Sequence, residues 1–200
     1  MMLPNIEQLK ITYKNLPDDK LMRLAVAEAT SLRPEALEIL QAEIKSRGLD
    51  NDIVNSVNAQ LIDTGSKEFD DYISLIRNQP CPACNSTHQP LNAAVIGTVK
   101  SFILLTRYKK KLMIACPTCL QQANQSGTST TALLGWWGLP WGIIRSTQAL
   151  ISNIKTAKKI KSTEPTDTLI AFVKTNIGII ESLRKNKQSL QAMLDSVNKR

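Results

Sequence analysis

The chain has 200 residues, of which 42% are hydrophobic and only 4% aromatic. This size and composition favour several small folded units over one large core. The first ten residues, MMLPNIEQLK, lack a basic stretch followed by an apolar run, so they predict no cleavable secretion signal. The cysteines of such a chain are expected in a reducing compartment, where disulfides are rare.

The net charge of +8 is distributed unevenly along the chain. Residues 1–75 carry 8 basic and 13 acidic side chains, a net charge of −5. Residues 76–163 carry 11 basic side chains and no acidic ones, and residues 164–200 carry 6 basic and 4 acidic ones. The basic middle segment therefore predicts contact with an anionic partner, either phospholipid headgroups or nucleic acid.

The acidic N-terminal segment predicts short helices. In NLPDDKLMRLAVAEATSL, Pro17 stands at a helix start and Asp18 and Asp19 follow in the first turn. We expect this helix to end near Ser31, and another helix to cover residues 52–61.

RPEALEILQAEIKSRGL repeats this pattern. Pro34 occupies the first turn, Leu37, Leu40 and Ile44 recur at helical spacing, and Gly48 stands where a left-handed cap would end the helix. The stretch PEALEILQAEIKSRGL resembles a small helical module found at the start of many uncharacterised bacterial proteins. That resemblance implies a packed helical hairpin.

Two CxxC pairs carry the clearest chemistry. Cys81 and Cys84 form one pair, Cys116 and Cys119 form the other, and 31 residues lie between them. Two such turns can supply the four thiolates of a tetrahedral zinc shell, with Zn–S bonds of about 2.3 Å. The spacing therefore predicts a structural zinc site in a zinc ribbon. A four-sulfur shell has no open position, so the metal is expected to stabilise the fold.

Other interpretations of the cysteines are a redox CxxC, a pair of disulfides, and a shell in which His88 replaces one sulfur. A redox pair is expected at a helix start within a thioredoxin-like βαβ pattern, which neither pair shows in the sequence. Disulfides would require export. Four cysteines complete the shell without His88, the only histidine, so we expect His88 in a polar loop.

The residues around and between the pairs predict an antiparallel ribbon. Asn85 tolerates the left-handed conformation that often follows the second cysteine of a metal knuckle, whereas Leu120 suits the equivalent position less well. AAVIGTVKSFILLT and KLMIA are rich in β-branched and apolar residues and predict strands, with RYKKK as the turn between them.

Catalytic motifs do not accompany this site. The chain has one histidine and no GxSxG, HExxH or phosphate-cradling glycine loop, and it has no paired acids near its basic centre. The sequence therefore predicts a protein that is not an enzyme.

All three tryptophans lie in the stretch ALLGWWGLPWGIIRSTQAL. Its apolar part, residues 132–144, is 13 residues long, and a spanning helix needs about 20. Tryptophan favours membrane interfaces, and lysines attract anionic lipid. We therefore expect contact with an anionic membrane surface through Trp136, Trp137, Trp141, Arg145, Lys155, Lys158, Lys159 and Lys161. Alternatively, the three rings cover the ribbon as part of a soluble core.

LLGWWGLPWGIIRSTQALISNI, together with the cysteine pairs, resembles a set of uncharacterised, mostly bacterial zinc-ribbon proteins. In that set a GWWGxPWGxIxxTxAL run follows paired CxxC knuckles, and the resemblance covers residues 78–154. It implies a zinc ribbon near or in a membrane and carries no activity. Arg145 departs from the pattern by placing a charge within the run, which argues against a simple membrane crossing.

The last segment predicts one long helix after STEPTD, with Asp167 as its cap. A seven-residue repeat indicates a coiled coil or self-association through Leu169, Asn176, Leu183, Leu190 and Val197 at one position and Phe172, Ile179, Asn186 and Met193 at the other. Alternatively, the helix packs onto its own protein, because Ile170, Val173, Ile177 and Ile180 widen its apolar face.

Together these patterns predict an α+β fold. Its parts are an N-terminal helical module (1–75), a small antiparallel β zinc ribbon (76–124), an apolar Trp/Gly-rich and basic membrane-interface segment (125–163) and a C-terminal long helix (164–200). The expected function is a non-catalytic, zinc-stabilised adaptor or scaffold associated with the cytoplasmic face of a membrane.

Two rival functions follow from the same residues. A soluble basic zinc ribbon would bind nucleic acid through Arg107, Lys109, Lys110, Lys111 and the lysines after Ser152, with Tyr108 and Phe102 stacking on bases. A thiol oxidoreductase would need dithiols that cycle between oxidation states.

Overall fold

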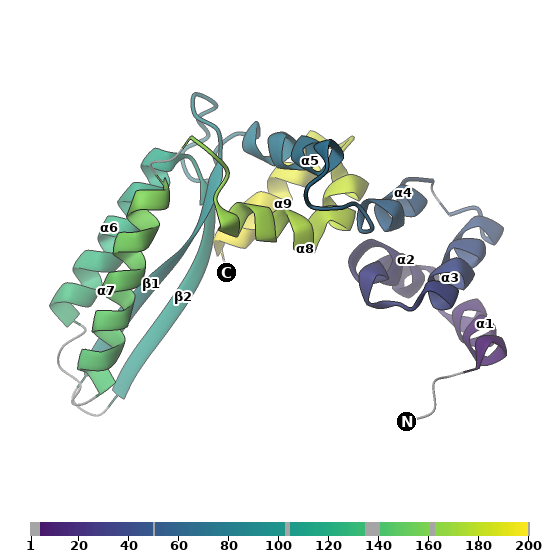
Figure 1. The fold of residues 1–200 in the computed structure, drawn as a ribbon, viewed down its shortest axis with the longest axis horizontal. Helices are drawn as coiled ribbons and strands as arrows, with labels where there is room; N and C mark the ends of the chain where they lie inside the picture. Colours follow the sequence, from purple (N-terminus) through teal and green to yellow (C-terminus); the bar gives the residue numbers. More distant parts are fainter. Residues whose placement is uncertain (1–4, 50, 103–104, 135–140, 161–162, 200) are drawn as a thin grey trace. The chain divides into compact units, whose positions relative to one another are not determined.

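The computed structural model describes residues 5–49, 51–102, 105–134, 141–160 and 163–199 (Figure 1). The described chain is a mixed structure of helices and a two-stranded antiparallel sheet. It divides into two compact units. The first comprises Met1–Tyr72 and Val173–Leu190, and the second comprises Ile73–Phe172 and Gln191–Arg200. Each unit therefore takes in part of the C-terminal sequence.

The first unit is helical. Its elements are α1 (Ile6–Asn15), α2 (Asp18–Ala27), the 3-10 turn η1 (Ala29–Ser31), α3 (Pro34–Ser46), α4 (Asn51–Ala59), the start of α5 (Lys67–Arg77) and the later part of α8 (Asp167–Leu183). The predicted helices at α2, α3 and α4 are confirmed, although α2 ends at Ala27 and the turn η1 occupies the stretch up to the predicted end at Ser31. Helices α1 and α5 were not predicted. Buried side chains of the first four helices form one core, which includes Tyr13, Leu21, Ala25, Leu40, Ile44, Ile53 and Val57.

Local sequence explains where these helices begin and end. Pro34 stands in the first turn of α3, where its missing N–H costs nothing. Gly48 has a φ of 64°, and its N–H donates to the carbonyl of Lys45. The next N–H, that of Leu49, donates to Ile44, so the left-handed glycine closes the helix as predicted.

Arg47 connects the end of α3 to the turn between α1 and α2. Its guanidinium donates to the main-chain carbonyls of Tyr13, Lys14 and Leu16 and to the carboxylates of Asp18 and Glu43, over 2.7–2.9 Å. The three carbonyls lie at the end of α1, where helix carbonyls lose their usual partners; that of Tyr13 also accepts from the N–H of Leu16. This fork explains the arginine of the RGL sequence, which periodicity alone does not.

We expect Arg47→Lys to lower the midpoint of thermal unfolding of the first unit by about 5 °C or more. A lysine ammonium has three N–H donors and cannot replace the five hydrogen bonds of the guanidinium. Arg23→Lys is the matched control, since Arg23 is 78% exposed and reaches Glu28 only at 3.7 Å. Thermal unfolding followed by circular dichroism measures both. Equal midpoints for the two variants would show that Arg47 does not hold the turn.

The second unit contains the sheet. Its elements are the end of α5, β1 (Asn92–Phe102), β2 (Leu105–Ala115), α6 (Pro117–Leu134), α7 (Trp141–Ile160), the start of α8 and most of α9 (Lys187–Lys199). The strands pair antiparallel, with Asn92 opposite Ala115 and Gly97 opposite Lys110. Helices α6 and α7 run side by side against this hairpin and pack mainly on β1 (Figure 1).

The predicted turn of the ribbon differs from the structure. RYKKK lies within β2 and is not the turn of the ribbon. The turn stands instead between Phe102 and Leu105, whose intervening residues lie outside the described ranges. Lysines fit an outer strand because their side chains reach water on either face.

The predicted single long helix over residues 164–200 is two helices, α8 and α9. The chain turns between them, with the N–H of Arg184 donating to Glu181 and the N–H of Asn186 donating to Leu183. The side chain of Asn186 then accepts from the N–H of Ser189 and caps α9. An unbroken seven-residue repeat through this point is therefore wrong. At the other end, Thr166 rather than Asp167 caps α8, because its hydroxyl accepts from the N–H of Leu169.

Side chains of the surrounding helices bond backbone groups at both edges of the hairpin. The amide of Asn153 in α7 accepts from the N–H of Gly97 at 3.1 Å and donates to its carbonyl at 3.0 Å. The hydroxyl of Thr131 in α6 accepts from the N–H of Val99. At the opposite edge, the amide of Asn198 in α9 makes the same two bonds to Ile114, each of 2.8 Å. Buried strand edges need such partners.

Candidate metal centre

The first cysteine pair lies in a tight turn between α5 and β1. The N–H of Cys81 donates to Ser86, and the N–H of Asn85 donates back to the carbonyl of Cys81 at 2.7 Å. Asn85 has a φ of 58° and is the one non-glycine residue with a positive φ in the described part of the chain. This conformation was predicted from its place after Cys84, and it turns both sulfurs of the pair toward one point.

The second pair begins a helix. Cys116 directly precedes α6 and Cys119 lies in its first turn, where the N–H of Leu120 donates to the carbonyl of Cys116. Leu120 is therefore helical and needs no left-handed conformation. The expectation of two equivalent knuckles is corrected: the turn at Cys81 and the helix start at Cys116 supply the two halves of the group.

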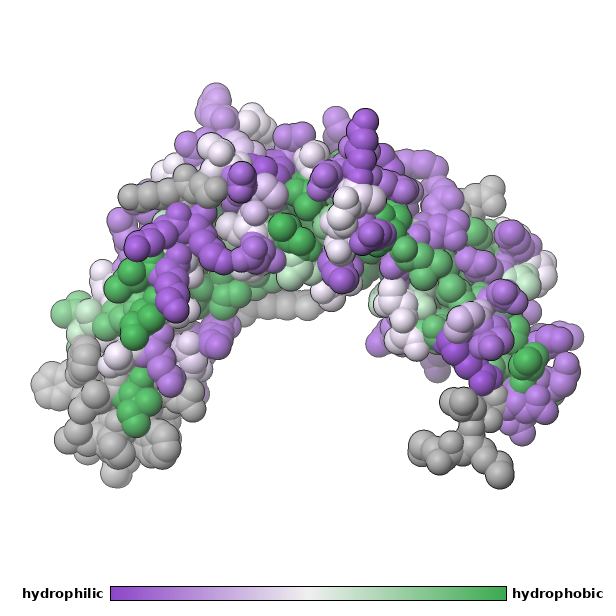
Figure 2. All heavy atoms as spheres, viewed as in Figure 1, coloured by the Kyte–Doolittle hydropathy of each residue, from purple (hydrophilic) through white to green (hydrophobic). Residues whose placement is uncertain are grey.

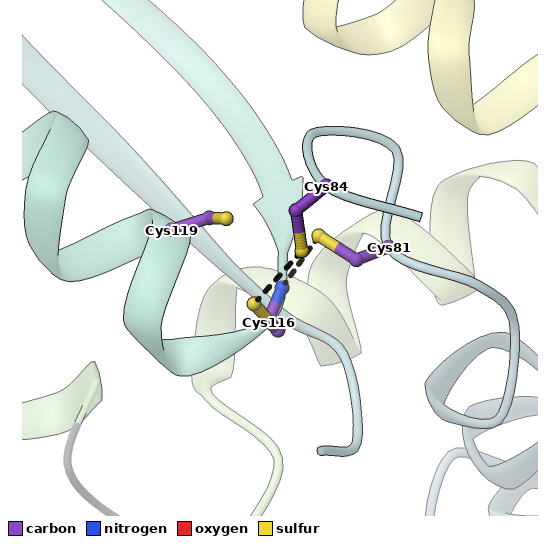
Figure 3. Close-up of side chains that lie close together, drawn as sticks. All are labelled: Cys81, Cys84, Cys116 and Cys119. Carbon is purple, nitrogen blue, oxygen red and sulfur yellow. Dashed lines mark hydrogen bonds between the residues drawn. The ribbon is translucent and has the colours of Figure 1, made fainter. Parts of the chain in front are cut away.

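The hairpin brings the two pairs together. All four sulfurs, of Cys81, Cys84, Cys116 and Cys119, lie within 4.8 Å of one another (Figure 3). The sulfurs of Cys84 and Cys116 are 3.8 Å apart, which is close to the edge of about 3.8 Å that a tetrahedron with zinc–sulfur bonds of about 2.3 Å would have. Each cysteine is a free thiol. This group of four cysteines is able to hold a metal ion.

Burial and hydrogen bonds distinguish the four thiols. Cys81 is fully buried and Cys116 is 4% exposed, whereas Cys84 faces solvent. Burial raises the pKa of Cys81, but hydrogen bonds from the main-chain N–H groups of Cys116, Ala83 and Cys84 outweigh it and lower that pKa to about 7. Burial raises the pKa of Cys116 and of Cys119. The N–H groups around Cys81 favour its thiolate, the form that binds metal.

The neighbourhood bears on the rival interpretations of these cysteines. The second pair does stand at a helix start, which the sequence did not suggest, but an antiparallel hairpin precedes it and not a parallel βαβ unit. The other pair lies against it, so a dithiol here has two more sulfurs within reach. His88 is exposed and is not part of the group. Its N–H donates to the hydroxyl of Ser86 in the loop.

The predicted membrane-contact residues are described only in part. Trp136, Trp137 and Lys161 lie outside the described residues. Trp141 begins α7 and Arg145 lies in its second turn, and their side chains are not described. Lys155, Lys158 and Lys159 are exposed on α7, and Lys159 forms an ion pair with Asp167.

Helix α7 also exposes large apolar side chains, which were not predicted from the sequence. Ile144, Ile151 and Ile154 are 47%, 50% and 57% exposed, and Leu133 on the adjoining α6 is 72% exposed. Figure 2 shows apolar side chains on this surface among polar ones. The signal was present in the sequence, because Ile144, Ile151 and Lys155 share one face of a helix at this spacing.

Helix lengths and apolar content bear on membrane crossing. Within the described part of the chain, no helix is both long enough and apolar enough to be a transmembrane span.

The chain was compared with protein-family models, with curated proteins and with solved structures. None of these comparisons finds a match.

Proposed function

We propose that the protein is a non-catalytic, zinc-stabilised adaptor that binds the anionic surface of a membrane at its cytoplasmic face. The cysteine group supports the zinc part of this proposal. Four sulfurs within 4.8 Å of one another suit zinc, which takes four thiolates in structural sites. Such a shell leaves no position for water or substrate, so the metal would tie the turn at Cys81 to the start of α6.

The exposed face of α7 carries the membrane part of the proposal. Ile144, Ile151 and Ile154 face solvent there, and exposed Lys155 and Lys158 follow within two turns. Aliphatic side chains followed by lysines on one helix face suit an interfacial helix that lies in the headgroup region of anionic lipid. The absence of acidic residues from 76 to 163 adds to the attraction.

Vesicle binding tests this proposal. We expect the protein to sediment with phosphatidylglycerol vesicles and not with phosphatidylcholine vesicles. Lys155→Glu should weaken binding about tenfold, because each lysine near such a surface contributes about 1 kcal/mol and the substitution also adds repulsion. Ile151→Gln should weaken it about fivefold by removing apolar burial.

Matched substitutions on exposed residues of the first unit control for charge and hydrophobicity. Lys187→Glu makes the same charge change on α9, and Ile11→Gln makes the same polarity change at a side chain that is 60% exposed. Both controls should bind vesicles like the parent protein. Equal losses in all four variants, or binding to oligonucleotides in place of vesicles, would exclude α7 as a membrane-binding helix.

A further inference from the structure

The two outer edges of the β-hairpin are covered unequally. In an antiparallel pair, the N–H and C=O groups of alternate residues point away from the partner strand. Gly97 belongs to this outward set of β1, because Asn153 occupies both of its groups. Lys110 stands directly opposite Gly97, and Leu112 and Ile114 stand opposite Val95 and Ala93 in the same phase. Their backbone groups therefore point outward from β2.

Of the outward residues Lys110, Leu112 and Ile114, the described structure gives a backbone partner to Ile114 alone. Asn198 bonds both backbone groups of Ile114. No hydrogen bond of the described residues reaches the outward N–H and C=O groups of Lys110 and Leu112. Lys110 and Leu112 together present two N–H and two C=O groups on this edge. The two residues are about 6.8 Å apart along the strand, which is the spacing that an added strand requires.

The side chains along this edge carry one sign of charge. Lys109 and Lys111 stand on one face of β2 and Lys110 on the other, and all three are exposed, as is Arg107. An added strand would therefore meet a cation above and below its backbone. A second copy of β2 would bring lysine against lysine, which is how edge lysines oppose self-pairing.

We propose that this β2 edge binds an extended acidic segment of a partner protein as a third antiparallel or parallel strand. The backbone groups of Lys110 and Leu112 would supply the ladder, and the lysines and Arg107 would select acidic side chains. The charge that excludes a second copy favours this occupant. The inference concerns β2 alone and does not depend on the lipid contact of α7.

Peptide binding tests the proposal with the whole 200-residue chain. The probe is a fluorescein-labelled heptapeptide of alternating glutamate and valine. Its matched control carries the same side chains but has methyl groups on alternate amide nitrogens, so that it keeps its charge and loses donors. We expect the control to bind at least about tenfold more weakly, since it lacks two or more ladder bonds.

Two variants locate the site on the protein. Leu112→Pro removes an outward N–H without removing a bond to β1, a change that edge strands tolerate. It should lower the affinity for the unmethylated peptide about tenfold. Leu112→Ala keeps the N–H and should bind like the parent protein. Hydrogen exchange should show slower exchange of the amides of Lys110 and Leu112 when the peptide is bound.

Other outcomes overturn the proposal. Equal affinity for the methylated peptide would mean that charge alone attracts it. No binding at about 1 mM peptide would mean that the edge takes no such strand. Displacement of the peptide by a single-stranded oligonucleotide, with equal loss in Leu112→Pro and Leu112→Ala, would identify a nucleic-acid surface. Vesicle binding by α7 can hold or fail in each of these cases.

Discussion

Replacing Cys116 by serine is expected to abolish zinc binding and to unfold the part of the second unit where the cysteine turn, the hairpin and α6 meet. The sulfur of Cys116 is buried and lies 3.8 Å from that of Cys84. Serine is a poor zinc ligand, and the three remaining thiolates would stay crowded without a cation between them. Binding of structural zinc contributes about 10–16 kcal/mol to such sites, so the loss should exceed the stability of the unit.

Metal content and stability measure this result together. The parent protein should contain one zinc ion per chain by elemental analysis, and the variant should contain almost none. The thermal transition of the second unit should disappear or fall by more than about 10 °C. Incubation of the parent protein with a strong chelator should have the same effect, and added zinc should reverse it.

His88→Ala is the matched control for this prediction. His88 is close to Cys84 in sequence but exposed and outside the sulfur group, so the variant should keep both its zinc and its transition. A Cys116→Ser protein with full zinc content and an unchanged transition would exclude the four-sulfur site. Zinc-free parent protein that cycles between dithiol and disulfide would favour a redox function instead.

The cysteine group and much of the first unit could be predicted from the sequence because their signals are local. The two-residue gap of each cysteine pair, the proline at the start of α3 and the glycine at its end each act within one turn of chain. Asn85 belongs to the same class, since its left-handed conformation is required by the turn in which it stands. Such features depend little on residues far away in the sequence.

The wrong predictions concern features that distant residues decide. RYKKK contains three lysines in a row and resembles a turn, yet it continues β2 because β1 lies opposite it residue by residue. The cysteines of CPTC resemble a second knuckle, yet the uncharged residues after them continue as α6. Neither choice can be made without knowing what lies across the hairpin.

Some polar residues within helices have a structural role that hydrophobic periodicity does not predict. Thr131 ends a run of small polar residues in α6, and Asn153 stands between Ile151 and Ile154 in α7. Both side chains are buried and bond the edge of β1. An asparagine in a helix interior has low helix propensity, so its presence at a buried position can indicate a backbone that it must satisfy. Asn198, which is half-buried near the end of α9, bonds the other edge of the hairpin in the same way.

Replacing Gly178 by alanine is expected to destabilise the first unit strongly, although alanine is the better helix former. In a helix interior this substitution ordinarily stabilises by up to about 1 kcal/mol. A Cβ on Gly178, however, would lie 2.3 Å from the carbonyl oxygen of Val26 and 2.5 Å from the side-chain nitrogen of Gln60. The first of these contacts is with main chain, which cannot turn away as a side chain can.

The contact with Gln60 adds to the cost. Its amide nitrogen donates to the carbonyls of Ala25 and Val26 at the end of α2, and its oxygen accepts from the N–H of Ala29. Moving Gln60 aside would leave these groups without partners in a part-buried site. We therefore expect a loss of about 3 kcal/mol in the free energy of unfolding, with a fall of more than about 10 °C in the midpoint.

Gly65→Ala is the matched control, because a Cβ there meets no atom within 4 Å. Its midpoint should stay within about 2 °C of the parent value. The zinc content should be unchanged in both variants, since the sulfur group belongs to the second unit. If Gly178→Ala were as stable as Gly65→Ala, then α8 would not approach the end of α2 this closely. The later part of α8 would then pack on the first unit in a different position.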